Sequence, residues 1–220
     1  MIKAVFFDID GTLVSFKTHV VPKSTLHAIE LLKKKGIKVF IATGRHRRSI
    51  NNLGDLEFDG YVTLNGGYVF AGKDDVIYKH SIPDKDIEAL VRYQEKEGEF
   101  PCAFVQEDEI FMNYTDQAKR IMKVLSHCES TRWNPLFTDI VPLGSSKRVG
   151  IDKMLEHYHI GLDECMAFGD GGNDIQMLSH VGIGVAMGNA AEDVMSAAGY
   201  VTTSVDENGV YNALKHFNII

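Results

Sequence analysis

Short apolar runs alternate with longer segments whose apolar residues recur at helical spacing along most of this chain. Continuous apolar runs are typical of strands buried on both faces of a parallel sheet, and helical spacing is typical of the helices that cover such a sheet. The first part of the chain predicts strands at 2–7, 37–42 and 61–64, a helix at 23–35, and a hairpin at 68–70 and 76–79. This alternation predicts an α/β fold with a doubly wound parallel sheet.

The alternation of strand and helix patterns stops near Pro83 and resumes at Lys147. Between them, the pattern predicts helices at 84–97 and 115–126 and strands at 102–105 and 110–113. After them, it predicts helices at 147–158, 190–198 and 210–217, a further helix through 177–178, and strands at 165–168 and 183–186. We therefore expect a core domain of residues 1–81 and 138–220, with an α+β domain of residues 82–137 inserted between them.

Two carboxylates end the first predicted strand. Asp8 and Asp10 follow an apolar run, and the chain then turns at Gly11. Charged residues are rarely buried unless they are paired or bind a metal. Either aspartate alone could be a turn former, because Asp is common in turns. The pair, at the end of a buried strand, indicates a site that holds a cation and an anion together.

Further polar residues stand where they could join this pair. Thr43 follows the second strand, Lys147 opens a helix, and the turn 169–174 contains Asp170 and Asp174. Ligands of doubly wound sheets bind beyond the carboxyl ends of the strands, so these residues can converge on one crevice. Taken singly, Thr43 could be a helix cap, Lys147 a solvated lysine, and the turn an ordinary surface turn.

These residue types favour phosphoryl transfer. Asp8 can attack phosphorus and form an aspartyl-phosphate. Mg²⁺ takes one or two carboxylates, a description that Asp8 and Asp170 fit. Thr43 and Lys147 can bind phosphate oxygens. Asp10 can protonate the leaving alkoxide and then activate the attacking water.

Composition narrows the range of partners. The net charge of −7 disfavours binding to nucleic acid or an anionic membrane, and 45% hydrophobic with 24% charged residues is usual for a globular protein. No apolar stretch of transmembrane length and no signal-peptide pattern are present in the sequence. Its three cysteines have no metal-binding or redox spacing. We expect a cytoplasmic protein with a small-molecule substrate, no nucleic-acid or membrane partner, and a monomeric state, although the sequence leaves the oligomeric state open.

Four ordered motifs resemble those of the haloacid dehalogenase superfamily. They are Asp8-Ile9-Asp10-Gly11-Thr12, Thr43-Gly44-Arg45, Lys147, and Gly169-Asp170-Gly171-Gly172-Asn173-Asp174. Two further segments narrow the resemblance to Cof-type sugar phosphatases, and these are Leu64-Asn65-Gly66 and residues 182–190. The chain is especially similar to the hexose phosphate phosphatases of Bacteroides.

The resemblance implies a role for each matching residue. Asp8 would be the nucleophile and Asp10 the acid and base. Magnesium would be held by the Asp8 carboxylate, the Asp10 backbone carbonyl and Asp170, with Asp174 orienting its waters. Phosphate and substrate would be bound by Gly11, Thr43, Gly44, Arg45, Asn65, Lys147 and Asn173.

These roles imply magnesium-dependent hydrolysis of small phosphomonoesters, above all hexose and other sugar phosphates. Two alternatives remain open. A sugar phosphomutase or phosphotransferase fits, because Asp10 can activate a hydroxyl as well as water. A phospho-accepting module like a receiver domain also uses an acid cluster, a Thr and a Lys, but it is shorter and has no insertion. The sequence does not name the physiological sugar.

The resemblance also implies that the insertion is a mobile cap, and here it is short. Caps of this type usually contain two α/β halves, whereas residues 82–137 supply one complete half. Either the cap is naturally reduced or a segment is absent. In the second case, we expect the junction near residues 126–129, and no sugar-recognition residue is assigned within the cap.

Overall fold

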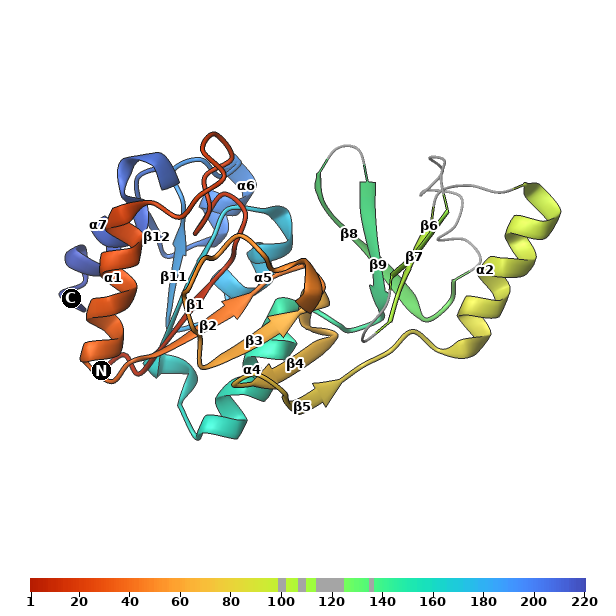
Figure 1. Cartoon of the computed structure of the whole chain (residues 1–220), viewed down its shortest axis with the longest axis horizontal. Coiled ribbons are helices and arrows are strands. Elements are labelled where there is room, and N and C mark those ends of the chain that lie inside the picture. Colours follow the sequence, from red (N-terminus) through yellow and green to blue (C-terminus); the bar gives the residue numbers. More distant parts are fainter. Residues whose placement is uncertain (99–101, 107–109, 114–124, 135–136) are drawn as a thin grey trace. The chain divides into compact units, whose positions relative to one another are not determined.

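The computed structural model describes residues 1–98, 102–106, 110–113, 125–134 and 137–220 (Figure 1). The chain divides into two compact units, one of residues 1–79 and 146–220 and one of residues 80–145. The insertion expected at 82–137 falls inside the second unit.

The first unit is built on an eight-stranded sheet with the strand order β12-β11-β10-β1-β2-β3-β4-β5. The strands are β1 (Ala4–Phe7), β2 (Lys38–Ala42), β3 (Gly60–Thr63), β4 (Tyr68–Ala71), β5 (Asp75–Lys79), β10 (Cys165–Gly169), β11 (Ile183–Ala186) and β12 (Tyr200–Val201). Every pairing from β12 through β3 is parallel, and β4 and β5 add an antiparallel edge. The predicted α/β class and the hairpin at the sheet edge are confirmed.

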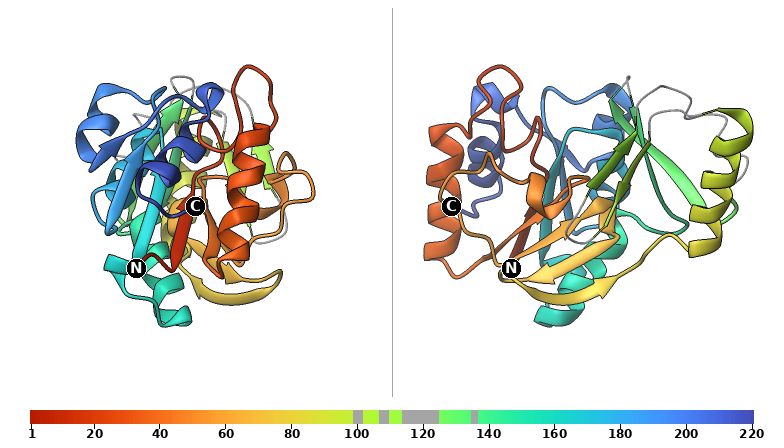
Figure 2. Two further views of the ribbon diagram at one scale, coloured as in Figure 1. Left: turned by 90° about the vertical axis from the view of Figure 1, so that its left-hand side faces the viewer. Right: turned by 45° about the vertical axis from the view of Figure 1, so that its right-hand side comes forward.

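Helices cover both faces of this sheet (Figure 2). The helices are α1 (Lys23–Lys34), α4 (Lys147–Tyr158), α5 (Ile175–Leu178), α6 (Glu192–Ala197) and α7 (Gly209–His216). Short 3-10 turns are found at Arg47–Ser49, Leu64–Gly66, Leu162–Glu164, Gly172–Asp174 and Val205–Glu207.

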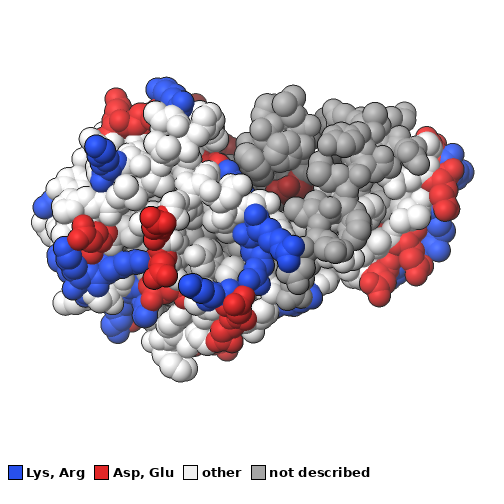
Figure 3. All heavy atoms as spheres, in the orientation of Figure 1, with Lys and Arg blue, Asp and Glu red and all other residues white. Residues whose placement is uncertain are grey.

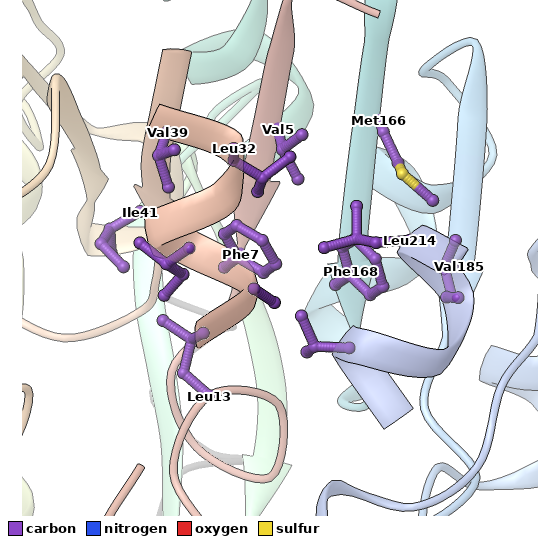
Figure 4. Packing of buried hydrophobic residues seen from close by; sticks show 14 of the residues in the cluster. Val5, Phe7, Leu13, Leu32, Val39, Ile41, Met166, Phe168, Val185 and Leu214 are labelled. Atoms are coloured by element: carbon purple, nitrogen blue, oxygen red, sulfur yellow. The ribbon is translucent and has the colours of Figure 1, made fainter. Parts of the chain in front are cut away.

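β1, β2, β10 and β11 each contribute to two hydrophobic clusters, because alternate side chains point to opposite faces. Val5 and Phe7 of β1 pack in one cluster with Leu32 of α1 and Leu214 of α7 (Figure 4). Phe6, from the same strand, packs in a second cluster that includes side chains of α4, α5 and α6. Both faces of the sheet are therefore buried, as its continuous apolar strands predict.

The order of the strands determines where the site forms. The chain builds β2 and β3 on one side of β1, and later builds β10 to β12 on the other side. A parallel sheet binds ligands at such a reversal, beyond the carboxyl ends of the strands. The carboxyl ends of three neighbouring strands thus meet on one side of the sheet, and they are followed by Asp8 (β1), Thr43 (β2) and Asp170 (β10).

The second unit contains α2 (Asp84–Glu97) and two antiparallel hairpins. They are β6 (Cys102–Val105) with β7 (Ile110–Asn113), and β8 (Cys128–Asn134) with β9 (Phe137–Pro142). A small cluster of Leu90, Leu125 and Cys128 forms its interior. Buried Asp86 joins α2 to the start of β8, since its carboxylate accepts a 2.8 Å hydrogen bond from the backbone N–H of His127.

Several local predictions differ from the structure. The helix expected at 115–126 lies largely outside the described residues. Helical spacing over 84–97 places Ile87, Leu90 and Val91 on one face, but only Leu90 is buried, and Ile87 and Val91 are 37% and 42% exposed. β12 was not expected, because a strand of two residues is too short to show a pattern.

The surface and the remaining helices add two observations. On the face drawn in Figure 3, acidic and basic side chains of the described residues are interspersed. None of the helices in the described part of the chain has the length and apolar character needed to cross a bilayer.

Candidate active site

Asp8 directly follows β1, at the carboxyl end of this central strand, and is buried. The Asp8 backbone N–H donates to the Phe168 carbonyl at 3.0 Å, which extends the pairing of β1 with β10 by one residue. The chain then turns tightly, and Gly11 adopts a φ of +82°. A Cβ at Gly11 would lie 2.1 Å from Oδ2 of Asp170. Glycine is therefore required here by both backbone conformation and space.

Lys147 lies at the centre of a buried charge network. It is the first residue of α4, and its Nζ donates to Asp8 Oδ1 and to Asp174 Oδ1, each at 2.6 Å. Both Lys147 and Asp174 have no exposed surface. The solvated-lysine interpretation of Lys147 is therefore wrong.

Asp174 also fixes the loop after β10. Its Oδ2 accepts hydrogen bonds from the backbone N–H groups of Asp170 and Gly171, both at 2.9 Å. One carboxylate thus joins the loop to Lys147. The expected role of Asp174 in orienting magnesium waters stays a prediction.

Asp170 is held by two residues that the sequence did not single out as part of the site. Thr12 Oγ1 donates to Asp170 Oδ1 at 2.8 Å. Asn189 Nδ2 lies 3.3 Å from Asp170 Oδ2 and donates to the Gly11 carbonyl at 2.9 Å. Thr12 belongs to the first motif and Asn189 to the run 182–190. Both residues therefore lie in motifs recognised in the sequence, but neither was assigned a role.

The three carboxylates form a group suited to a hard cation. Ligand atoms of Asp8, Asp170 and Asp174 all lie within 4.8 Å of one another. Carboxylate oxygens are what Mg²⁺ prefers, and Lys147 offsets one of the three charges. The residues therefore fit a divalent metal, with Asp8 and Asp170 as candidate ligands because Asp174 already bonds to Lys147 and the loop.

Electrostatics point in the same direction. Burial raises the pKa of Asp8 to about 7, with a further increase from Asp174 and an opposing effect of Lys147. Burial also raises the pKa of Asp170 to about 8, and the charges of Asp8 and Asp174 add to the rise. A bound divalent cation would reverse this tendency, because it favours the ionised carboxylates.

Asp10, which is not one of these three carboxylates, pairs with Arg45. The guanidinium donates from Nε to Asp10 Oδ2 at 2.7 Å and from Nη2 to Oδ1 at 2.6 Å. Its Nη1 donates to the Ser49 carbonyl at 2.8 Å. Such bidentate pairs fix geometry as well as charge. Arg45, expected near the substrate, thus contacts the predicted acid and base directly.

The remaining predicted residues lie on two neighbouring loops. Thr43 is buried after β2, followed by Gly44, and its carbonyl accepts from the Asn65 backbone N–H at 3.1 Å. Buried Asn65 accepts at Oδ1 from Asn173 Nδ2 at 2.9 Å. The loop after β3 is therefore linked to both the Thr43 loop and the 169–174 turn.

Comparison with known proteins identifies the family. A model of the haloacid dehalogenase-like hydrolases matches residues 5–131 and 114–214. The chain belongs to this family. The predicted resemblance is confirmed, and so is the prediction of an enzyme.

Individual relatives span almost the whole chain. The Bacillus subtilis protein YkrA, which is named as a phosphatase, is 32% identical over 99% of this chain and 98% of its own length. The structure of the subclass IIB sugar phosphatase BT4131 is 44% identical, covers 99% of this chain and 100% of its own, and superposes with a TM-score of 0.90. The structure of BT1666 from Bacteroides thetaiotaomicron is 35% identical, covers 100% of this chain and 96% of its own, and has a TM-score of 0.92.

These comparisons also bear on the length of the insertion. The alignment with YkrA spans 256 positions against a chain of 220 residues, so at least 36 positions have no residue here. The two matches to the family model overlap at residues 114–131, a range that includes the expected junction at 126–129. The chain is therefore shorter than YkrA over the aligned region, and the shortened insertion stays a prediction.

Proposed function

We propose that this protein hydrolyses the phosphomonoesters of small sugars, with Mg²⁺ as cofactor and Asp8 as the nucleophile. The buried network of Asp8, Lys147 and Asp174, with half-buried Asp170 beside it, carries this proposal. The similarity to a sugar phosphatase at 44% identity supports the substrate class.

The nucleophile is held in place before the substrate arrives. Lys147 bonds to Asp8 Oδ1 and, through Asp174, to the loop after β10. This fixes the direction from which the Asp8 carboxylate attacks phosphorus, and the phosphoryl group passes to an Asp8 oxygen as the sugar oxygen leaves. Asp8 and Asp170 would hold Mg²⁺, which would supply charge neutralisation for the anionic nucleophile and the anionic phosphate.

Asp10 handles the proton. It gives a proton to the leaving oxygen and later takes one from the water that attacks the aspartyl-phosphate. Because both Asp10 oxygens accept hydrogen bonds from Arg45 here, that pair has to loosen when Asp10 becomes protonated. Arg45 is in this account a positioning residue for Asp10. Thr43, Gly44 and the remaining predicted binding residues would hold the phosphate and sugar.

A phosphate-release screen tests the proposal. Purified protein is assayed with hexose and pentose phosphates, with Mg²⁺ and after exhaustive removal of metal with EDTA, and Asp8→Asn is the matched control. We expect metal-dependent release from wild-type protein and none from Asp8→Asn. Full activity after metal removal would overturn the metal assignment, and appearance of a sugar bisphosphate or an isomerised sugar phosphate would favour phosphoryl transfer.

A further inference from the structure

The loop between β1 and α1 is drawn in dark red in Figures 1 and 2. It carries two strongly exposed apolar residues. Phe16 is 57% exposed and Val20 is 58% exposed. Single exposed apolar residues are common on protein surfaces and need no explanation by themselves. Phe16 differs from Val20 in its position, which is next to the group formed by Asp8, Asp170 and Asp174.

The position of Phe16 follows from Gly11. A Cβ built on Gly11 would lie 2.6 Å from the Phe16 ring carbon Cε2 and 2.1 Å from Asp170 Oδ2. Two atoms that close to one point cannot be more than 4.7 Å apart. The edge of the aromatic ring is therefore next to a candidate metal ligand, an arrangement that the positive edge of the ring favours. Phe16 as a whole residue is nevertheless more than half exposed.

The residues beside Phe16 are tied down. Ser15 Oγ donates to Asp206 Oδ1 at 2.6 Å, and Lys17 Nζ lies 3.1 Å from Asp206 Oδ2. The neighbouring Val205 N–H donates to Asn189 Oδ1 at 2.9 Å, and Asn189 in turn bonds to the Gly11 carbonyl. Asn189, which also contacts Asp170, thus links this part of the chain to the carboxylate group.

We propose that Phe16 is an apolar subsite of the core unit that contacts a ring in the leaving group of the substrate. This inference rests on the proposed function, in which the phosphate lies at Asp8 and Asp170. The leaving group is bonded directly to the phosphate. An aromatic side chain beside the carboxylates where this phosphate lies is therefore close enough to contact the leaving group. Phe16 has no polar atom, and what it can favour is the C–H face of a sugar ring or the face of a planar base. An open-chain polyol presents no such face.

Matched substrates separate a ring preference from a general loss of activity. Glucose 6-phosphate and sorbitol 6-phosphate carry the same carbon chain, closed in the first and open in the second, and pyridoxal 5′-phosphate supplies a planar aromatic ring. We expect Phe16→Ala to raise KM for the preferred ring substrate by about 10-fold, as the loss of one aromatic contact predicts. For sorbitol 6-phosphate, KM should change less than twofold, and kcat should change little for all three. If KM rises more for glucose 6-phosphate, Phe16 favours a sugar ring, and if it rises more for pyridoxal 5′-phosphate, Phe16 favours a planar aromatic ring.

Two variants serve as controls. Val20→Ala removes an equally exposed apolar side chain from the same loop and should change no kinetic constant. Phe16→Trp keeps an aromatic face and should keep the low KM for ring substrates. An equal loss on ring and open-chain substrates would mean that Phe16 only supports the loop, and unchanged kinetics in Phe16→Ala would likewise overturn the proposal.

Calorimetric binding of the same three compounds to wild-type protein and Phe16→Ala separates this inference from the proposed function. If wild-type protein hydrolyses none of them, the proposed function fails. The subsite is then supported by a loss of ring-specific binding in Phe16→Ala, and it is overturned if binding of all three compounds is the same in both proteins.

Discussion

Lys147 compensates one buried carboxylate in a group of three. Burying unpaired charge is costly, and a deficit of two positive charges at this site fits a divalent cation. The cost also explains the number of hydrogen bonds around Asp170 and Asp174, which come from Thr12, Asn189 and backbone N–H groups. At this scale, the site depends on residues that orient carboxylates as much as on the carboxylates themselves.

Asn189 is the orienting residue that is simplest to test. Asn189→Ala removes the hydrogen bonds to the Gly11 carbonyl and to Val205, and the contact with Asp170. We expect Mg²⁺ affinity to fall by about 10- to 100-fold, which is typical when a ligand loses its supporting partner. Asn212→Ala, at an exposed Asn that also donates a side-chain hydrogen bond, is the matched control. Equal Mg²⁺ titration curves for Asn189→Ala and wild-type protein would refute this role.

Asp10 should separate the two halves of the reaction. A nitrophenyl leaving group needs little protonation, whereas a sugar alkoxide needs a proton, and both substrates give the same aspartyl-phosphate. We therefore expect Asp10→Asn to release a burst of about one nitrophenol per active site and then to turn over about 100- to 10,000-fold more slowly than wild-type protein. Rapid-quench measurement decides the point. Equal slowing of both substrates with no burst would mean that Asp10 acts elsewhere, for example through the metal.

Among the helices and strands, sequence patterns predicted best the features that neighbouring residues determine, such as the ends of helices. The expected bounds of α2 and α4 agree with the structure, because each begins at a clear boundary and keeps helical spacing. The four motifs predicted which loops meet, since a parallel sheet brings its carboxyl ends together. The pairing of Asp10 with Arg45, and the contacts of Thr12 and Asn189 with Asp170, join residues far apart in the sequence. No local pattern encodes them.

The turn after β3 shows such a long-range requirement. Leu64, Asn65 and Gly66 all have positive φ angles, an uncommon run that is costly for the two residues that have a Cβ. A Cβ at Gly66 would lie 1.9 Å from the Ser146 carbonyl oxygen, directly before Lys147. The turn is thus packed against the first turn of α4, and it supports the position of Lys147.

Gly66→Ala should therefore lower both stability and kcat. Gly72 is the matched control, since it also has a positive φ but a Cβ there would meet nothing within 4 Å. We expect Gly72→Ala to cost about 1–2 kcal/mol of unfolding free energy with unchanged kcat, which is the backbone effect alone. Gly66→Ala should cost more and lower kcat as well. If thermal midpoints and kcat of the two variants agree, the contact with α4 does not position Lys147.

For the whole molecule, the raised pKa values of Asp8 and Asp170 link stability to pH and metal. Both values lie above the ordinary 3.8, at about 7 and about 8, so the folded protein binds more protons than the unfolded chain between pH 4 and 7. These two groups therefore lower the free energy of unfolding as pH rises through that window. Mg²⁺ competes with the protons, and its stabilising effect should grow as they leave.

Thermal unfolding at pH 5 and pH 8, with and without Mg²⁺, measures this linkage. We expect Mg²⁺ to raise the thermal midpoint more at pH 8 than at pH 5. Asp170→Asn removes one of the two titrating groups and a candidate ligand, so its Mg²⁺-dependent increase should be smaller at both pH values. An Mg²⁺ effect that is independent of pH, or unchanged in Asp170→Asn, would contradict the assignment of these carboxylates.

In the proposed reaction, Asp8 carries the phosphoryl group during turnover. The most direct test is to quench Asp10→Asn in acid during its burst with nitrophenyl phosphate and to map the phosphorylated residue by peptide mass spectrometry. We expect one phosphoryl group on the peptide that contains Asp8, located on Asp8 itself, and none when Asp8 is also changed to Asn. A burst with no modified peptide, or a phosphoryl group on another residue, would contradict it.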